Sequence, residues 1–226
     1  MSVAKDDSGA NNTSGNGTSA SLTTLTVGTN GNTCLIGILC FANGTLPTGP
    51  ALVWDSVGAN QSMTSEITST GPGPQRVIIF SLANPATGNK TLSASWTGVS
   101  DFVLGAINFS GVNQTTPVVV ADSAAANGTS TAPSVTVTSD INGATIAGLS
   151  AQVGINAETQ TQIFRVVGNM AADATYALGG TSNVHGFTLA SSAGWATAGI
   201  HVQQVQAAGA PDPTFAAHVI QSALRW

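Results

Sequence analysis

Short apolar or alternating runs, separated by turn residues about every 8 to 15 positions, follow one another through most of the chain. Strands do not alternate with helical patterns, so a βαβ fold is disfavoured. No internal repeat is strong enough to indicate a solenoid or a propeller. The sequence predicts an all-β protein, an antiparallel jelly-roll-like or immunoglobulin-like β-sandwich with an extended N-terminal arm. The predicted strands lie within 21–29, 33–42, 51–57, 75–83, 90–98, 101–111, 133–139, 144–153, 161–167, 174–180, 184–191 and 195–205.

The run at 33–42 is apolar on both faces of a strand. Such a strand is either buried on both sides or has one face in an interface. Cys34 and Cys40 are the only cysteines, and within one strand they lie about 20 Å apart, too far for a disulfide. We therefore expect two small buried side chains, with intermolecular pairing as the alternative. One face carries Cys34, Ile36, Ile38 and Cys40, and the other carries Leu35, Leu39 and Phe41.

Three regions differ in composition. Residues 1–20 are rich in Asn, Gly, Ser and Thr and have little apolar content beyond Val3, so we expect an arm that is disordered unless something holds it. Residues 21–206 form the predicted β-sandwich domain. Residues 207–226 form a tail or closing element that fits a helix beginning near Asp212 as well as a strand.

Charged residues make up only 7% of the 226-residue chain, with a net charge of −5, where a typical soluble domain has roughly 25%. No Lys/Arg cluster is present to neutralise phosphates or an anionic membrane surface, so we expect neither nucleic acid nor membrane as a partner. A surface of Ser, Thr, Asn, Gly and Ala loses the charge repulsion that keeps soluble proteins apart. It suits a protein that lies against neighbours, although extracellular β proteins have similar compositions.

No motif in the sequence names a reaction. The nucleophile-elbow and phosphate-binding loop patterns are absent. His185, His201 and His218 could converge on zinc, but they lack the close spacing that places two ligands on one strand face. We therefore expect no metal, no cofactor and no enzymatic activity. The carboxylates considered as a glycosidase-type pair are Asp55, Glu66, Asp101, Asp122, Asp140, Glu158 and Asp173, and turn hydrogen bonding is their more ordinary role.

Aromatic side chains could stack on sugar rings. Trp54, Trp96, Trp195 and Tyr176 each lie in or beside a predicted strand, so we expect core or sheet-edge packing instead.

Three segments carry a resemblance to a known class of proteins. They are an apolar strand ending in Leu82–Gly88, a strand with Trp96, and a strand that runs from Ala106 through Val112 into Gln114–Pro117. Together they resemble β-sandwich domains of tailed-phage virions and related bacterial surface proteins. The run Trp195–Val202 looks like the closing strand of such domains. The resemblance implies a sandwich fold and a structural or adhesive role on a particle, and it implies no catalytic residue.

The resulting expectation is a structural virion protein, a capsid decoration or cement protein that binds other virion proteins such as the major capsid protein and forms a homo-oligomer. The N-terminal region lacks the apolar core of a secretory signal, so we expect assembly in the host cytoplasm and release by lysis, or an extracellular location reached another way. The alternatives are a receptor- or glycan-binding fibre domain and a secreted carbohydrate-active enzyme. The expected interface residues are Val3, Leu35, Leu39, Phe41, Phe215, Ile220, Leu224 and Trp226.

Overall fold

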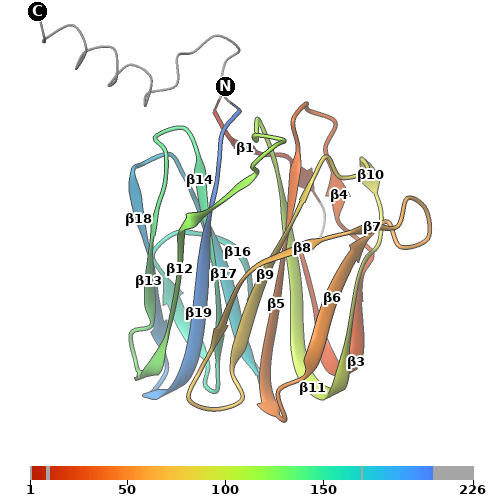
Figure 1. Ribbon diagram of the computed structural model, residues 1–226. Helices are drawn as coiled ribbons and strands as arrows, with labels where there is room; N and C mark the ends of the chain where they lie inside the picture. Colours follow the sequence, from red (N-terminus) through yellow and green to blue (C-terminus); the bar gives the residue numbers. More distant parts are fainter. Residues whose placement is uncertain (1, 9–10, 169, 206–226) are drawn as a thin grey trace, which may run out of the picture.

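The computed structural model describes residues 2–8, 11–168 and 170–205, and these ranges form antiparallel strands without a helix (Figure 1). This confirms the all-β prediction and is consistent with a β-sandwich. No helix in the described ranges is long and apolar enough to cross a membrane. The strands are β1 (Ala4–Lys5), β2 (Asp7–Ser8), β3 (Asn12–Leu22), β4 (Thr26–Val27), β5 (Cys34–Gly44), β6 (Thr48–Trp54), β7 (Gln61–Ser62), β8 (Thr64–Thr70), β9 (Arg76–Ala83), β10 (Gly88–Asn89), β11 (Leu92–Ser110), β12 (Val118–Ser130), β13 (Ser134–Thr138), β14 (Ala144–Ala151), β15 (Ile155–Glu158), β16 (Thr161–Val166), β17 (Ala171–Leu178), β18 (Ser182–Leu189) and β19 (Ala193–Val202).

The first half of the chain contains a small three-stranded sheet with the order β10-β4-β2. The rest of this half forms one curled eight-stranded sheet, drawn in red to yellow-green in Figure 1. Its path is β7-β6-β11-β5-β9-β8, and β1 and β3 pair with β11. The 19-residue strand β11 changes partner along its length, because its first part pairs with β6 and its second part with β5. A register shift between Ser95 and Ser100 separates the two parts. Bulges bend a strand, and this one lets the sheet curl around a core that contains Trp54, Phe80 and Leu104.

The second half forms a sandwich of two sheets, drawn in green to blue in Figure 1. One sheet has the order β12-β19-β14-β17-β16 and the other has the order β13-β18-β15. In β13, Val135 and Val137 are buried while Thr136 and Thr138 are exposed, as the alternation in the sequence predicted. The interior of this half contains a smaller apolar cluster around Leu149, Phe187 and other residues.

The two halves pack against each other through a third apolar core. Ile36 and Ile38 of β5 face Ile146 of β14 and Ile200 of β19 in this shared cluster. The other face of β5 belongs to the core of the first half. The strand is therefore buried on both sides within its own chain. Of the two possibilities for a strand that is apolar on both faces, burial on both sides is the one observed, and neither face is left for an interface.

The halves repeat one strand order. The path β3-β11-β5-β9-β8 in the first half corresponds to β12-β19-β14-β17-β16 in the second. The pairing registers agree, since Ile36 pairs with Ile107 in the first half and Ile146 pairs with Ile200 in the second. The contacts between the halves follow the same correspondence. The contact of β14 with β9 is equivalent to that of β5 with β17, and the contact of β19 with β8 is equivalent to that of β11 with β16. The chain is thus a structural duplication with an approximate two-fold relation between its halves.

The predicted N-terminal arm lies in the fold of the same chain. Residues 12–22 form β3, which pairs along β11, and Val3 is 3% exposed and packs in the core between the halves. The Val3 amide also donates a hydrogen bond to the carbonyl oxygen of Asn142, 2.9 Å away. The arm is therefore held by its own domain, and no second molecule is needed to order residues 12–22. Residues 207–226, the predicted tail, lie outside the described residues.

Candidate functional site

The predicted interface residues fall into two groups. Val3, Leu35, Leu39 and Phe41 are at most 3% exposed and lie in core clusters of their own chain. They have almost no exposed surface to offer a partner, so a contact surface on the described part of the chain would lie on other residues. The remaining members of the set are outside the described residues, and these are Phe215, Ile220, Leu224 and Trp226.

The described tryptophans are buried. Trp54, Trp96 and Trp195 are 0%, 6% and 8% exposed. Each indole nitrogen donates a hydrogen bond within the chain: Trp54 to the Ala86 carbonyl at 2.8 Å, Trp96 to the Gly17 carbonyl at 3.0 Å and Trp195 to Ser130 Oγ at 3.0 Å. A buried ring with its N–H already paired offers no platform for a sugar. The core and sheet-edge packing predicted for these residues is confirmed.

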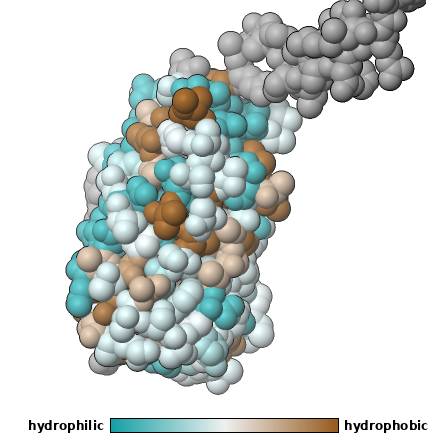
Figure 2. All heavy atoms as spheres, turned by 90° about the vertical axis from the view of Figure 1, so that its left-hand side faces the viewer, coloured by the Kyte–Doolittle hydropathy of each residue, from teal (hydrophilic) through white to brown (hydrophobic). Residues whose placement is uncertain are grey.

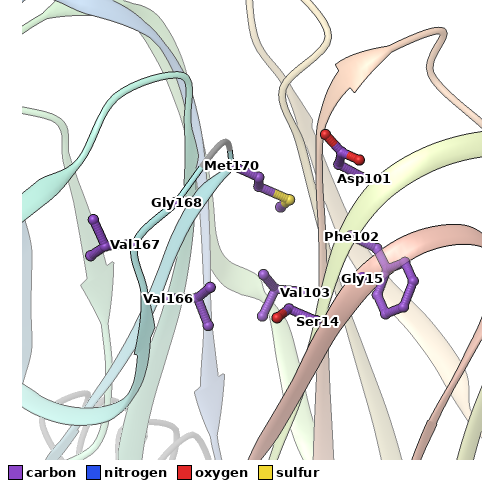
Figure 3. A pocket seen from close by; sticks show the side chains of 9 residues that line it. All are labelled: Ser14, Gly15, Asp101, Phe102, Val103, Val166, Val167, Gly168 and Met170. Atoms are coloured by element: carbon purple, nitrogen blue, oxygen red, sulfur yellow. The ribbon is translucent and has the colours of Figure 1, made fainter.

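A cavity of about 270 Å³ lies between the halves beside β3. Figure 3 shows side chains from both halves around it. Asp101 is the single ionisable residue among those lining it, and its two carboxylate oxygens accept hydrogen bonds from Asn16 Nδ2 at 2.6 Å and Asn43 Nδ2 at 3.2 Å. A glycosidase needs two carboxylates, and this cavity supplies one. Its lining residues are Ser14, Gly15, Asp101, Phe102, Val103, Val166, Val167, Gly168 and Met170.

A second cavity, of about 280 Å³, lies at the start of the chain and includes Asp6 and Asp7. The Asp7 side chain is fully buried and forms an ion pair with Lys5 at 3.2 Å. Its oxygens accept hydrogen bonds from the backbone N–H of Asn108 and from Asn11 Nδ2, each at 3.1 Å. Asp7 therefore attaches the segment around β2 to β11. Its oxygens are taken up by these contacts, so it is not free to act on a substrate.

The two histidines in the described part of the chain have different hydrogen-bond partners. His185 is buried between two hydroxyl groups, with Nδ1 2.7 Å from Thr175 Oγ1 and Nε2 2.9 Å from Thr145 Oγ1. Burial lowers the pKa of His185 to about 4, so the ring is neutral at pH 7. His218 lies outside the described residues.

His201 belongs to a separate cluster beside a bulge in β12. Its Nδ1 lies 2.8 Å from Asp122 Oδ2, and its Nε2 accepts a hydrogen bond from the Asp140 backbone N–H at 3.2 Å. The ring is 1% exposed and both nitrogens are engaged. An imidazole in this state has no free nitrogen for proton transfer to a substrate.

A buried ion cluster joins β16 to β17. Arg165 Nε donates to Asp173 Oδ2 at 2.9 Å, and the same guanidinium pairs with Glu158. Burial raises the pKa of Asp173 to about 6, although the hydrogen bond and charge of Arg165 act in the opposite direction. The Asp173 side chain is 0% exposed and that of Glu158 is 17% exposed. Both carboxylates pair with the same guanidinium, so their charges serve this ion cluster.

The outer surface has few apolar side chains, and they are dispersed. Figure 2 shows one side of the molecule, where most side chains have intermediate hydropathy and apolar ones form small separate groups. Isolated exposed apolar residues are normal on soluble proteins. A contact surface on the described part must therefore rely largely on polar groups and strand edges. The larger exposed apolar residues are Val57, Val99, Val120, Ile141, Val167, Leu178 and Val184.

Several features of the site were not visible in the sequence. The polar strands β3, β8 and β12 were not predicted as strands, and each is an edge strand of one of the two sheets that face each other. No group of three or more His, Cys, Asp or Glu residues in the described ranges could hold a metal ion. No family model, no curated protein and no solved structure matches the chain.

Proposed function

We propose that the chain is a structural virion protein, most specifically a capsid decoration or cement protein that stabilises a particle through protein–protein contacts. The observation that carries the proposal is the burial of Trp54, Trp96 and Trp195 with their indole N–H groups paired internally. A glycan- or receptor-binding domain would require some of these rings at the surface beside polar loops. The surface instead is largely polar, with few charges and only dispersed apolar side chains.

The scarcity of charge supports the same proposal. Only five Lys and Arg residues occur in the chain, and Arg165, Lys5 and Lys90 form ion pairs with carboxylates of their own chain. A surface of this kind lacks the repulsion that keeps molecules apart in solution. It is suited to close packing on a particle, where hydrogen bonds and shape supply the contact.

The test is identification of the protein on particles. Virions banded by density from lysates of the source culture should contain this chain in a fixed ratio to the major capsid protein, measured by quantitative mass spectrometry. Adding the purified chain to particles stripped of it should raise the temperature at which they release DNA. Absence from the particles, or turnover of a polysaccharide by the purified chain, would overturn the proposal.

The structure also dictates which variants are suitable for that test. Deleting residues 1–20 would remove Val3 from the core and most of β3 from the sheet, so a loss of binding would report unfolding. Substitutions of exposed side chains on β3 leave the core intact and are the better probes.

A further inference from the structure

The two equivalent edge strands of the duplicated fold differ in how they are covered. β12, the edge of the second half, lies against β8 and β13, and Ser69 Oγ of β8 donates a hydrogen bond to the Ala126 carbonyl at 2.9 Å. By the two-fold relation, β3 should lie against β16 in the same way. The cavity lined by Ser14, Gly15 and Val166 occupies that place instead. The edge of β3 is therefore open where the edge of β12 is closed.

The sequence of β3 carries neither charge nor proline, and its only irregularity is the register shift in its ladder with β11 between Gly17 and Ser19. Natural edge strands are shielded by charges, proline or bulges that turn them away. The other edges of the two facing sheets have such charges, with Glu66 on β8, Arg165 on β16 and Asp122 in the bulge of β12. The 11 residues of β3 contain no charged residue and no proline. Side chains including Ser14, Asn16 and Thr18 are exposed along it.

We propose that the open edge of β3 pairs with the β3 edge of a second copy of this chain, antiparallel and about a two-fold axis, so that two curled sheets become one. The occupant is a second copy because identical strands without charge meet with no like-charge repulsion. An edge strand with a net charge would instead favour a partner of opposite sign. Backbone hydrogen bonds supply the affinity in this mode of association, and a two-fold axis closes the assembly at two chains.

This inference deepens the proposed assembly role by naming one partner, and its test uses the isolated full-length protein. Sedimentation velocity and light scattering over a range of concentrations should show a reversible dimer. Changing Ser14 and Thr18 together to lysine places like charges on both strands of the pair. We expect this variant to dissociate at concentrations at least tenfold higher than the wild type.

A matched control and a rescue make the result specific. Thr136→Lys with Thr138→Lys places the same charges on exposed positions of β13, and we expect the dimer to remain. Mixing the Ser14→Lys/Thr18→Lys protein with a Ser14→Glu/Thr18→Glu protein should restore dimers of mixed composition. Circular dichroism of each variant reports whether the fold is retained.

A third measurement does not depend on charge. Ser14→Cys together with Thr18→Cys adds exposed thiols to a chain whose own cysteines are buried. Position 14 of one copy faces position 18 of the other when the axis passes near Asn16, so mild oxidation should trap a disulfide-linked dimer. A wild-type chain that stays monomeric, or a dimer that the β3 lysines do not weaken, would overturn the inference. A monomer that still binds particles would overturn this inference alone and leave the proposed function standing.

Discussion

His185 and Thr175 form a hydrogen bond of 2.7 Å between Nδ1 and Oγ1 in the interior of the second half, where neither residue has any exposed surface. The pKa of His185 is lowered to about 4, from an ordinary value of 6.5, because burial disfavours the charged ring. Between about pH 4 and pH 6.5 the His185 ring is therefore protonated in the unfolded chain but neutral in the folded chain.

The first prediction concerns pH. The contribution of His185 to stability is complete above about pH 6.5 and is lost as the pH falls towards 4, by roughly 3 kcal/mol at most. Urea unfolding of the wild type and of His185→Gln at pH 7.5 and pH 4.5 should show a smaller loss on acidification in the variant.

Asp173 has to be separated from this effect. Its folded pKa is raised to about 6, so its own contribution runs the other way and declines as the pH rises from about 4 to 6. The comparison between wild type and His185→Gln removes this shared background. Equal pH dependence in the two proteins would contradict the role given to His185.

The second prediction concerns the contact between the halves. A Cβ atom at Gly148 would lie 2.8 Å from Ile38 Cγ2 and 3.0 Å from Val77 Cγ1, so β14 approaches β5 and β9 closely because position 148 has no side chain. Gly148→Ala should lower the free energy of unfolding by about 1–3 kcal/mol through overpacking. Denaturant melts followed by tryptophan fluorescence measure the change.

The matched control is Gly17→Ala on β3. A Cβ atom there meets its nearest neighbour at 3.9 Å, an ordinary contact. We expect a change within about 0.5 kcal/mol at this surface position. A Gly148→Ala protein as stable as the Gly17→Ala protein would show that the halves can separate slightly without loss.

The third prediction concerns the buried ion cluster. Arg165→Met removes the cation that pairs with the fully buried Asp173 carboxylate at 2.9 Å. Leaving a buried charge without its partner costs about 3–5 kcal/mol. Thermal melts should therefore show a large loss for Arg165→Met, and adding Asp173→Asn in the same chain should recover much of it. A double variant no more stable than the single one would argue that the arginine acts through packing alone.

The fourth prediction concerns the cysteines. Cys34 and Cys40 are buried and unpaired, as the spacing in the sequence predicted, and burial raises the pKa of the Cys34 thiol to about 12 and that of Cys40 further. A thiol that stays protonated and inaccessible does not react as a nucleophile. The native protein at pH 8 should react with a thiol reagent only on unfolding, when two equivalents are consumed. Rapid labelling of the native chain would show that β5 is exposed in solution.

Interior strands could be predicted from the sequence because their own residues are apolar and so require burial. The apolar runs of β5, β9, β14 and β19 each require a covered face, and each lies in a core. The edge strand β3 has no such pattern. Its neighbour β11 holds it in place through a long ladder, and a ladder depends on the partner and not on local composition.

The polar groups were harder to place for a related reason. Thr145, Thr175 and His185 meet only because β14, β17 and β18 come together across the second half. No spacing within a single strand signals that contact. The duplication could not be recognised in the sequence, because the halves share pairing registers but not residues. For example, the pair of Gly15 with Phe102 in the first half is equivalent to the pair of Gly128 with Trp195 in the second.

Because its halves repeat one strand order, the contacts between them come in equivalent pairs. The cavity beside Ser14 stands where the equivalent place in the other half holds the hydrogen bond from Ser69 to the Ala126 carbonyl. The two equivalent strand edges therefore differ in their contacts although the strand path behind them is the same.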